Sequence, residues 1–459
     1  MTAIITDVLK KQLLSNVFEE IRANTHKYFI GIGRSEQWDA SETVPTPTDA
    51  PKTIRDTRSA LQSIKSASDV TFVIPRYNWS SGAIYQAYDD TFTTIPASNS
   101  YYVITEDNQV YICLQQGKSA TGAAITSTVK PTGTTTKPFK TADGYIWKFL
   151  YALSASRASK FLSSNFVPVE KILDSAELGR SLTTIETQQA SIQDACTPGQ
   201  VIGVAITNGG TGYTSTPTIT IQGDGSGASA TATVSGGAVV KIELDSSTDS
   251  TMSMGHSYNF VGALISGGGG TGATARIILG PDSGMGNDVR DELKSTSLMF
   301  NTKPSGTEDS AFIIDQDFRQ VILMRDPTDS ADSAYGGASG KVLNFLLTTS
   351  ATQAASFAVD TVITGGSSAA KAVVDEVDNA KILFHQNDST GFLPFTEGEA
   401  LSGGGGAATL VAGGVDADND AFSTSTIKKT SGEILYIENR APVVRSANQT
   451  EDIKVVITL

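Results

Sequence analysis

Side chains with specialised chemistry are scarce in this sequence. Its 459 residues include 2 cysteines, 3 histidines and 3 tryptophans. None of His26, His256 and His385 has a second histidine or a cysteine at the spacing of a metal site. Cys113 and Cys196 lie far apart; they could pair, but two reduced thiols are the favoured interpretation. These scarcities argue against both a metal centre and a disulfide framework.

Basic charge is also in short supply. The chain carries 34 Lys and Arg against 48 Asp and Glu, which gives a net charge of −14. Nucleic acids and anionic membrane surfaces attract basic proteins, so neither is expected as a partner. No apolar run approaches the length of a membrane span, and the N-terminal MTAIITDVLKKQLL lacks the cleavage site of a secretory signal. We therefore expect no membrane insertion.

Cofactor-binding motifs are missing as well. GDGSGA, from Gly223, has the glycines of a dinucleotide-binding loop. That fingerprint also needs a helix after the glycines and an acidic residue about 20 residues further on. Here alternating Ala and Thr follow, a pattern that favours a strand, and the sequence has no GxxxxGK[ST] phosphate loop. We expect no cofactor.

One acidic cluster has the spacing of a calcium loop. Asp416, Asp418 and Asp420 match the opening of an EF-hand. The glycine expected next is Ala421, and the bidentate glutamate of the twelfth position is Ile427. A solvated acidic turn is the better interpretation, and no metal site is predicted.

Motifs of hydrolytic enzymes are absent too. The chain has no nucleophile-elbow motif, which a serine hydrolase of that class would carry. Glu433 and Glu438 could form the carboxylate pair of a glycosidase, but five residues apart on a strand they would point to opposite faces. We therefore predict that the chain is not an enzyme.

Glycine, by contrast, is abundant. The 43 glycines and the low charged fraction of 18% favour turn-rich β structure over helical bundles. Residues 5–24 predict a helix, because Leu9, Leu13, Val17 and Ile21 recur every four residues. This helix either packs into the core or docks against another subunit, and both interpretations stay open. The predicted fold class is mainly β with some α structure: a β-sandwich core with helical excursions.

Several other segments have a clear expected conformation. Tyr101 to Leu114 contains YYVIT and VYICL around a polar turn, which predicts a β-hairpin. Residues 53–66 have a helical apolar pattern and follow a proline-rich loop over 43–53. The run AFIIDQDFRQVILMR, residues 311–325, predicts a pair of strands.

The final stretch, residues 431–459, is SGEILYIENRAPVVRSANQTEDIKVVITL. Ile453, Val455 and Ile457 alternate with Lys454, Val456 and Thr458, close to the period of a strand with one buried face. Asn439 to Pro442 has turn chemistry, which predicts a break between two strand runs. We expect the closing strands to complete a core begun far upstream.

Two long glycine-rich segments, 197–283 and 346–425, interrupt the chain. The first contains four strand-like runs, at Val201 to Thr207, Thr218 to Gln222, Ala228 to Val234 and Ala238 to Leu244. An internal repeat is visible, because GSGASATATV from Gly225 matches GTGATARIIL from Gly270. Shorter versions, GGSSAAKAVV and GGGGAATLVA, lie in the second segment. Both segments are predicted to form peripheral β modules outside the core.

The closing stretch resembles the C-terminal end of the dimeric baseplate-wedge protein of contractile-tailed phages. Four upstream blocks fit the same family in the same order: IGRSEQW (Ile32 to Trp38), VIPRYNW (Val73 to Trp79), DGYIWKFLY (Asp143 to Tyr151) and FRQVILMRDP (Phe318 to Pro327). The resemblance leaves out the two glycine-rich segments, which are similar to the small glycine-turn β modules of many phage tail structural proteins.

The resemblance implies a structural role. A member of this family is a homodimer in the virion, made in the host cytoplasm and placed in the wedge of the tail baseplate. It contacts other baseplate wedge proteins and holds the baseplate until its shape changes on host attachment. The fold implied is a two-layer β-sandwich with an inserted helical domain.

The same blocks contain candidate interface or structural-anchor residues. All three tryptophans fall inside them, and large aromatic side chains anchor either a core or an interface. Arginine and glutamate stand two residues apart in both the first block and the closing stretch, which favours charge-assisted hydrogen bonds. The candidates are Arg34, Glu36, Trp38, Arg76, Trp79, Trp147, Glu438 and Arg440.

The expected organisation has five parts. They are an N-terminal part of the wedge core with helical segments (1–196), the first glycine-rich insert (197–283), a return to the core (284–345), the second insert (346–425) and C-terminal core strands (426–459).

An alternative function stays open: a receptor- or glycan-binding tail module that uses the glycine-rich inserts. A wedge subunit should assemble with sibling tail proteins, whereas such a module should bind host cells alone. A tail-associated hydrolase is the least favoured interpretation, since no catalytic constellation is visible.

Overall fold

The fold is mainly antiparallel β structure. The computed structural model describes residues 4–96, 98, 100–173, 175–247, 250–412, 423–424 and 426–459. Strands account for 39% of the chain and helices for 13%, so the predicted fold class, mainly β with some α structure, is confirmed.

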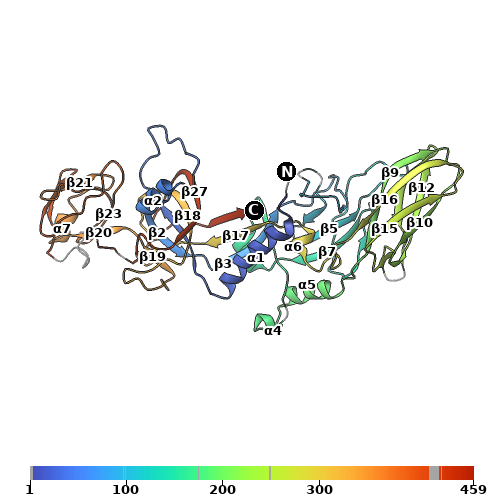
Figure 1. Ribbon diagram of the computed structural model, residues 1–459, viewed down its shortest axis with the longest axis horizontal. Coiled ribbons are helices and arrows are strands. Elements are labelled where there is room, and N and C mark those ends of the chain that lie inside the picture. Colours follow the sequence, from blue (N-terminus) through green and yellow to red (C-terminus); the bar gives the residue numbers. More distant parts are fainter. Residues whose placement is uncertain are drawn as a thin grey trace. The chain divides into compact units, whose positions relative to one another are not determined.

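Seven short-to-medium helices are found in the described residues (Figure 1). They are α1 (Asp7–Arg22), α2 (Pro51–Ala60), α3 (Ala155–Phe161), α4 (Ser175–Leu178), α5 (Thr184–Asp194), α6 (Val289–Glu292) and α7 (Ala351–Ala354). The helix expected over 5–24 is confirmed as α1. The helix expected over 53–66 is confirmed only up to Ala60, where α2 ends. Its second half is wrong, because strand β2 (Leu61–Ser66) follows directly. Pairing of β2 with β1 (Tyr28–Gly33) overrides the local helical pattern.

The chain forms two compact units, each assembled from segments far apart in sequence. Unit 1 consists of Met1–Leu14, Thr71–Met299 and Ile457–Leu459, and unit 2 of Ser15–Val70 and Phe300–Val456. The first glycine-rich segment belongs to unit 1, and the second belongs to unit 2.

One sheet of unit 1 has the order β4-β5-β7-β6. Its strands are β4 (Tyr102–Ile104), β5 (Gln109–Gln115), β6 (Phe139–Lys140) and β7 (Ile146–Ala152). The hairpin expected between Tyr101 and Leu114 is confirmed as the antiparallel pair β4–β5. Trp147 on β7 is fully buried in an aromatic cluster with Tyr85 and Tyr145, which forms the core of this region.

The glycine-rich segment of unit 1 is a set of paired strands, which lie side by side in green and yellow in Figure 1. They are β9 (Val201–Thr211), β10 (Thr218–Gly223), β11 (Ser226–Ala228), β12 (Ala230–Ser235), β13 (Ala238–Leu244), β14 (Met254–His256), β15 (Val261–Ser266) and β16 (Thr271–Leu279). The sheet orders are β13-β12-β10-β15, β16-β9 and β11-β14. All four strand runs expected here are present, and the first extends further than its pattern indicated.

The internal repeat has a structural counterpart. Tyr213 and Tyr258 are both buried. A Cβ atom added to Gly270 would lie 2.5 Å from Cγ of Tyr213, and one added to Gly225 would lie 2.5 Å from Cγ of Tyr258. These glycines are the first residues of the two matched repeats, so each repeat begins by covering a tyrosine ring at a distance that only glycine permits.

A further sheet has the order β28-β17-β3-β8. Its strands are β3 (Asp69–Pro75), β8 (Phe166–Val169), β17 (Ser297–Thr302) and β28 (Ile453–Thr458). Ile453 and Val455 of β28 are buried, in agreement with the alternation in the closing stretch.

Unit 2 contains a five-stranded sheet of order β19-β2-β1-β18-β27. Besides β1 and β2 it uses β18 (Asp317–Arg325), β19 (Ser339–Lys341) and β27 (Glu433–Val444). Its apolar core is formed by Phe29, Leu61, Ile64, Ile322, Met324, Tyr335, Val342 and Ile427.

Two expectations about this sheet are wrong. Residues 311–325 contain one strand, β18, instead of two. Side chains bind the backbone carbonyls of the residues before it: Ser63 donates to Ala311 O at 2.5 Å and Arg445 to Ile313 O at 2.8 Å. The turn expected at Asn439 to Pro442 is also absent, since β27 runs through it. A register shift opposite Phe318 and Gln320 and an edge position accommodate the proline.

The second sheet of unit 2 is seven-stranded, with the order β25-β24-β21-β22-β23-β20-β26. Its strands are β20 (Asn344–Leu347), β21 (Val362–Gly365), β22 (Lys371–Asp378), β23 (Lys381–His385), β24 (Ala400–Gly403), β25 (Gly406–Thr409) and β26 (Ser423–Thr424). Most of this sheet comes from the second glycine-rich segment, and it buries a core of its own around Phe357, Phe384 and Phe395.

Candidate functional site

The segment that follows β1 carries three of the predicted anchors. Gly33 ends the strand, and a Cβ there would lie 2.5 Å from Ala60 O, so only glycine fits. Arg34 adopts a left-handed backbone with φ 63°, and its N–H donates to Ala60 O at 2.8 Å. This bend turns Ser35 and Glu36 toward the strands of the glycine-rich segment in unit 2.

A bulge in the neighbouring sheet supplies the partner. The β22–β23 register shifts between Val374 and Glu376, which leaves Asp375 as the extra residue. Bulges re-aim side chains, and here Asp375 is directed toward His385 at the end of β23. Both side chains are 1% exposed.

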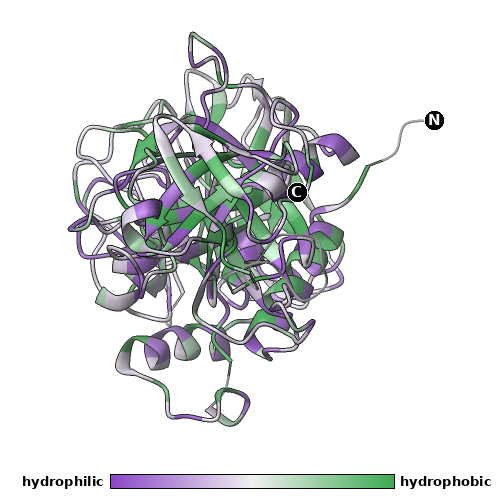
Figure 2. Ribbon diagram, turned by 90° about the vertical axis from the view of Figure 1, so that its left-hand side faces the viewer, coloured by the Kyte–Doolittle hydropathy of each residue, from purple (hydrophilic) through white to green (hydrophobic). Residues whose placement is uncertain are grey.

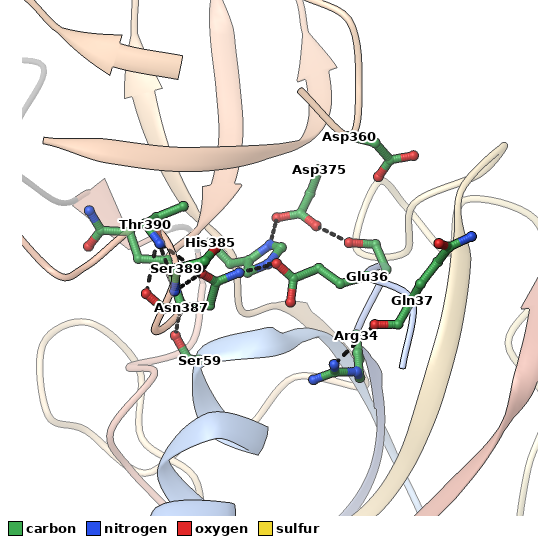
Figure 3. Close-up of polar contacts among 12 residues, drawn as sticks. Arg34, Glu36, Gln37, Ser59, Asp360, Asp375, His385, Asn387, Ser389 and Thr390 are labelled. Atoms are coloured by element: carbon green, nitrogen blue, oxygen red, sulfur yellow. Dashed lines mark hydrogen bonds and ion pairs between the residues drawn. The ribbon is translucent and has the colours of Figure 1, made fainter. Parts of the chain in front are cut away.

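His385 lies between two carboxylates (Figure 3). Its Nδ1 donates to Asp375 Oδ2 at 2.6 Å, and its Nε2 lies 3.2 Å from Glu36 Oε1. Ser35 Oγ donates to the other oxygen of Asp375 at 2.9 Å, and Asn387 Nδ2 donates to Glu36 Oε1. We name this group of residues, Ser35, Glu36, Asp375, His385 and Asn387, the histidine clasp.

The charges of the clasp support one another. Burial lowers the pKa of His385, but the carboxylates of Asp375 and Glu36 outweigh burial and raise it to about 9. Burial likewise raises the pKa of Glu36, and the close approach of the positively charged His385 outweighs it and holds that pKa below its ordinary value. At neutral pH the clasp therefore contains an imidazolium between carboxylates.

Serine, histidine and aspartate also make up hydrolase triads, but their connectivity here is different. In a triad the serine hydroxyl donates to the histidine, and the aspartate orients the other ring nitrogen. Here Ser35 donates to Asp375, while the second nitrogen of His385 faces Glu36. With His385 protonated and buried, the clasp is arranged to join two segments of the chain.

The other anchors near the clasp use backbone and ring contacts. The Arg34 guanidinium lies 4.2 Å from the centre of the Trp38 ring, a cation–π contact. Trp38 Nε1 donates to Arg440 O at 2.9 Å. Within the described residues the Arg440 side chain forms no ion pair, and its Nε is buried without a hydrogen-bond partner. Glu438 accepts a hydrogen bond from Tyr436 at 3.2 Å and is not part of the clasp.

The remaining anchors lie in unit 1. Arg76 donates to Asn78 Oδ1 and to Ser163 O, both at 2.8 Å. Trp79 is half-buried and donates to Ser127 Oγ at 3.2 Å, whereas Trp147 is a core residue. The structure thus groups Arg34, Glu36, Trp38 and Arg440 in one unit, and Arg76, Trp79 and Trp147 in the other.

Several residues of this region were not predicted. Asp375, His385 and Asn387 lie in the glycine-rich segment, and His385 was considered only as a catalyst or metal ligand. Arg319, 3% exposed, binds Ser35 O and both oxygens of Glu42. A sequence signal does exist: Asp375 and His385 each interrupt a strand-like apolar run, where a polar residue needs a buried partner.

Unit 1 buries a second group of titratable side chains. Glu292 is 1% exposed; it accepts a hydrogen bond from Gly286 N, and its other oxygen has no partner among the described residues. Burial raises the pKa of Glu292 to about 8 and lowers the pKa of Lys148, whose Nζ donates to Thr136 O at 2.6 Å. Cys196 lies nearby, and burial raises its pKa to about 12, far from a reactive thiolate.

Among the residues that the structure describes, no group of three His, Cys, Asp or Glu side chains is placed to hold a metal ion. The acidic residues Asp416, Asp418 and Asp420 lie outside the described part of the chain. None of the described helices is long and apolar enough to cross a membrane.

The comparisons with known proteins add no relative. The sequence matches no protein-family model, and a search of curated proteins finds no match.

Proposed function

We propose that this chain is a structural subunit of a phage tail baseplate wedge. Three of the blocks that carry the resemblance are neighbours in unit 2. Gln320 of FRQVILMRDP pairs with Gly33 of IGRSEQW on one side and with Asn439 of the closing stretch on the other. Residues from three distant parts of the sequence form one sheet, which supports a common origin for the three blocks. This meeting of the blocks carries the proposal.

Side-chain contacts link the same three blocks. Trp38 of the first block donates to the carbonyl of Arg440 in the closing stretch, and Arg319 of the middle block donates to the carbonyl of Ser35. The blocks therefore serve to position one another. We assign them a structural role and no catalytic one.

An exposed apolar surface supports assembly with other chains. The N-terminal segment and the first turns of α1 present five large apolar residues that are between 48% and 85% exposed: Ile4, Ile5, Val8, Leu9 and Leu13. Figure 2 shows the hydrophobic stretch close to the N-terminus. Contiguous exposed apolar side chains mark interaction surfaces. We assign this α1 stripe to contact with a neighbouring wedge protein, and the assembled subunit to the virion.

Sedimentation and reconstitution test this proposal. The resemblance implies a homodimer, so the purified chain should sediment at twice 48.1 kDa. It should also join a complex when mixed with the sibling tail proteins of its own phage. Leu9→Glu with Leu13→Glu should abolish that complex without unfolding the chain. Phe260→Glu, at a residue 80% exposed on the glycine-rich segment of the same unit, is the matched control.

Two results would contradict the proposal. A chain that stays monomeric at micromolar concentration and joins none of the sibling proteins is not a wedge subunit. Equal loss of assembly in Phe260→Glu would remove the assignment of the α1 stripe.

A second function, receptor or glycan binding through a glycine-rich segment, is favoured by one observation, a cavity beside that segment in unit 1.

A further inference from the structure

Unit 1 contains a cavity of about 360 Å³ between two parts of the chain. One wall is the loop Gln86–Phe92 with the end of β5, and the other is formed by β9 and β13 of the glycine-rich segment. Small-molecule sites in proteins have volumes of about 300–1,000 Å³. The cavity is therefore large enough for a ligand of one or two sugar rings.

Part of the cavity wall is apolar. Ala87, Leu114, Val204 and Met252 contribute aliphatic or thioether surface to it. Such a wall excludes water from one side of a ligand and favours a ligand that has an apolar face of its own.

The charged groups around the cavity are largely neutralised by each other. Lys241 pairs with Glu243, which also accepts a hydrogen bond from Gln115 Nε2 at 2.7 Å. Arg276 donates to both oxygens of Asp89 at 2.7 Å. The acidic side chains of the lining are thus neutralised by basic partners. The remaining charged residue of the lining, Lys118, is exposed to solvent, where a charge contributes little to binding, so a neutral ligand is favoured.

Uncharged polar groups, by contrast, have spare hydrogen-bonding capacity. Within the described residues, the side-chain amide of Gln86 and the hydroxyl of Tyr88 have no hydrogen-bond partner, and the Oε1 atoms of Gln115 and Gln116 accept none. Amides and hydroxyls supply donors and acceptors together, and a hydroxyl group on a ligand uses both. The cavity thus fits a ligand with many hydroxyls and an apolar ring face.

We propose that this cavity binds a neutral saccharide of one or two rings. A sugar combines equatorial hydroxyls, which match the amides of Gln86, Gln115 and Gln116, with C–H faces that match the apolar wall. The proposal rests on the second candidate function, glycan binding through this segment, and names its site and ligand class. It is independent of the structural role in a baseplate.

Saturation-transfer NMR on the purified full chain tests the ligand class. The neutral probes are glucose, galactose, N-acetylglucosamine, maltose, lactose and chitobiose. The charged probes are glucose 6-phosphate, glucosamine and glucuronic acid. We expect transfer to the ring protons of at least one neutral sugar and binding at least about tenfold weaker for its charged counterparts. Equal or tighter binding of the charged probes would overturn the neutral class.

Paired variants test the site. Ala87→Trp fills the cavity and should abolish binding, whereas Ala123→Trp, in an exposed loop, should leave it unchanged. Gln86→Ala removes one amide and should weaken binding about threefold or more, with Gln222→Ala on the exposed face of β10 as its control.

Melting of each variant shows whether its fold is retained. If Ala87→Trp does not fold, the effect of Gln86→Ala on sugar binding alone tests whether the cavity is the binding site. Absence of transfer to every neutral probe at tens of millimolar, or binding unaffected by both cavity variants, would overturn the proposal. These measurements use the chain alone, so they can fail or succeed independently of the assembly experiment.

Discussion

The imidazolium of His385 links the residues after β1 to strands β22 and β23 through Asp375 and Glu36. Its charge is buried and paired with carboxylates on both sides. Removing one partner of such a group leaves the others uncompensated, which costs about 3–5 kcal/mol. The contribution of this single side chain is therefore measurable against the whole stability of the protein.

We predict that this contribution depends on pH. The pKa of His385 in the folded chain is about 9, above the ordinary value of 6.5. The stabilisation is fully present below pH 6.5 and is lost as pH rises through about 9, with a total of about 3 kcal/mol. His385→Gln should lower the free energy of unfolding at pH 7, and the difference from wild type should shrink toward pH 10.

Denaturant unfolding at pH 6, 7, 8, 9 and 10 measures this difference. His256→Gln is the matched control, because the His256 side chain is exposed and, among the described residues, forms a single hydrogen bond, to the adjacent Ser257 at 3.1 Å. A constant difference between wild type and His385→Gln over this range would show that the histidine is neutral in the folded protein.

Glu292 should behave in the opposite manner to a stabilising carboxylate. Burial raises its pKa from 4.5 to about 8, so folding favours the protonated carboxyl group. The stability that this protonated group contributes to the folded chain is lost as pH rises from 4.5 through about 8. Glu292→Gln keeps the group neutral and should stabilise the protein by about 3 kcal/mol at pH 7 and little at pH 4.5.

Melting curves of wild type and Glu292→Gln between pH 4.5 and 8 test this prediction. Glu106→Gln serves as the control, because Glu106 belongs to the same unit and is 80% exposed. A variant that is less stable than wild type throughout would mean that the carboxylate is ionised and held by Lys148.

At the scale of elements, the glycine-rich segment of unit 1 rests on two covered tyrosines. We predict that Gly270→Ala and Gly225→Ala each lower its stability, because the new methyl group would lie 2.5 Å from the ring of Tyr213 or Tyr258. Overpacking of this kind typically costs about 1–3 kcal/mol. Gly262→Ala is the control, since no heavy atom lies within 4 Å of the added methyl group there.

Hydrogen exchange of the amides in β9, β10, β15 and β16 reports this change directly. Faster exchange in Gly270→Ala than in Gly262→Ala is expected. Rescue by Tyr213→Ala in the Gly270→Ala background would identify the ring contact as the cause. Failure of that rescue would identify instead the contact with the backbone nitrogen of Tyr213, 2.6 Å from the added methyl group.

Local patterns predicted elements well where the interactions are local. Alternation gave the hairpin of Tyr101 to Leu114 and the strands of the first glycine-rich segment, because period and turn chemistry act within a few residues. The mistake at residues 61–66 arose because pairing with β1, about thirty residues away in sequence, decides that conformation. Asn439 to Pro442 was misjudged for the same reason, since a bulge against β18 allows the strand to continue.

The candidate site was only half predictable. Glu36 and Trp38 were identified as anchors from their block, but Ser35 meets Asp375 across 340 positions of sequence. A single sequence contains no signal for such a distant pair. Only the polar interruptions of apolar runs at Asp375 and His385 hint that buried partners exist.

At the scale of the whole molecule, the first glycine-rich segment can be tested as a separable part. Its first and last strands are neighbours: Val201 pairs with Leu279, and Gly280 N donates to Gln200 O at 2.9 Å. The chain therefore leaves and returns at one place, where a short linker can close the gap. We predict that replacing residues 197–283 by a Gly/Ser linker leaves a folded chain, because a long surface insertion changes loop closure by only about 0.6 kcal/mol per doubling of length.

Size-exclusion mass and cooperative melting of the shortened chain measure the outcome. Loss of the Asp89–Arg276 and Gln115–Glu243 contacts should lower its melting temperature only modestly, since both pairs are partly exposed. A shortened chain that is insoluble with every linker length would show that the segment is part of the core.

The division of the chain into units has a consequence for proteolysis. The backbone passes from one unit to the other at 14–15, 70–71, 299–300 and 456–457. A protease that cuts in an exposed loop between the second and third passages, for example at Ala123, produces two fragments, and each fragment contributes to both units. Neither fragment can depart without unfolding two hydrophobic cores. The nicked protein should therefore keep its native mass on a sizing column and show its two pieces only in denaturing gels.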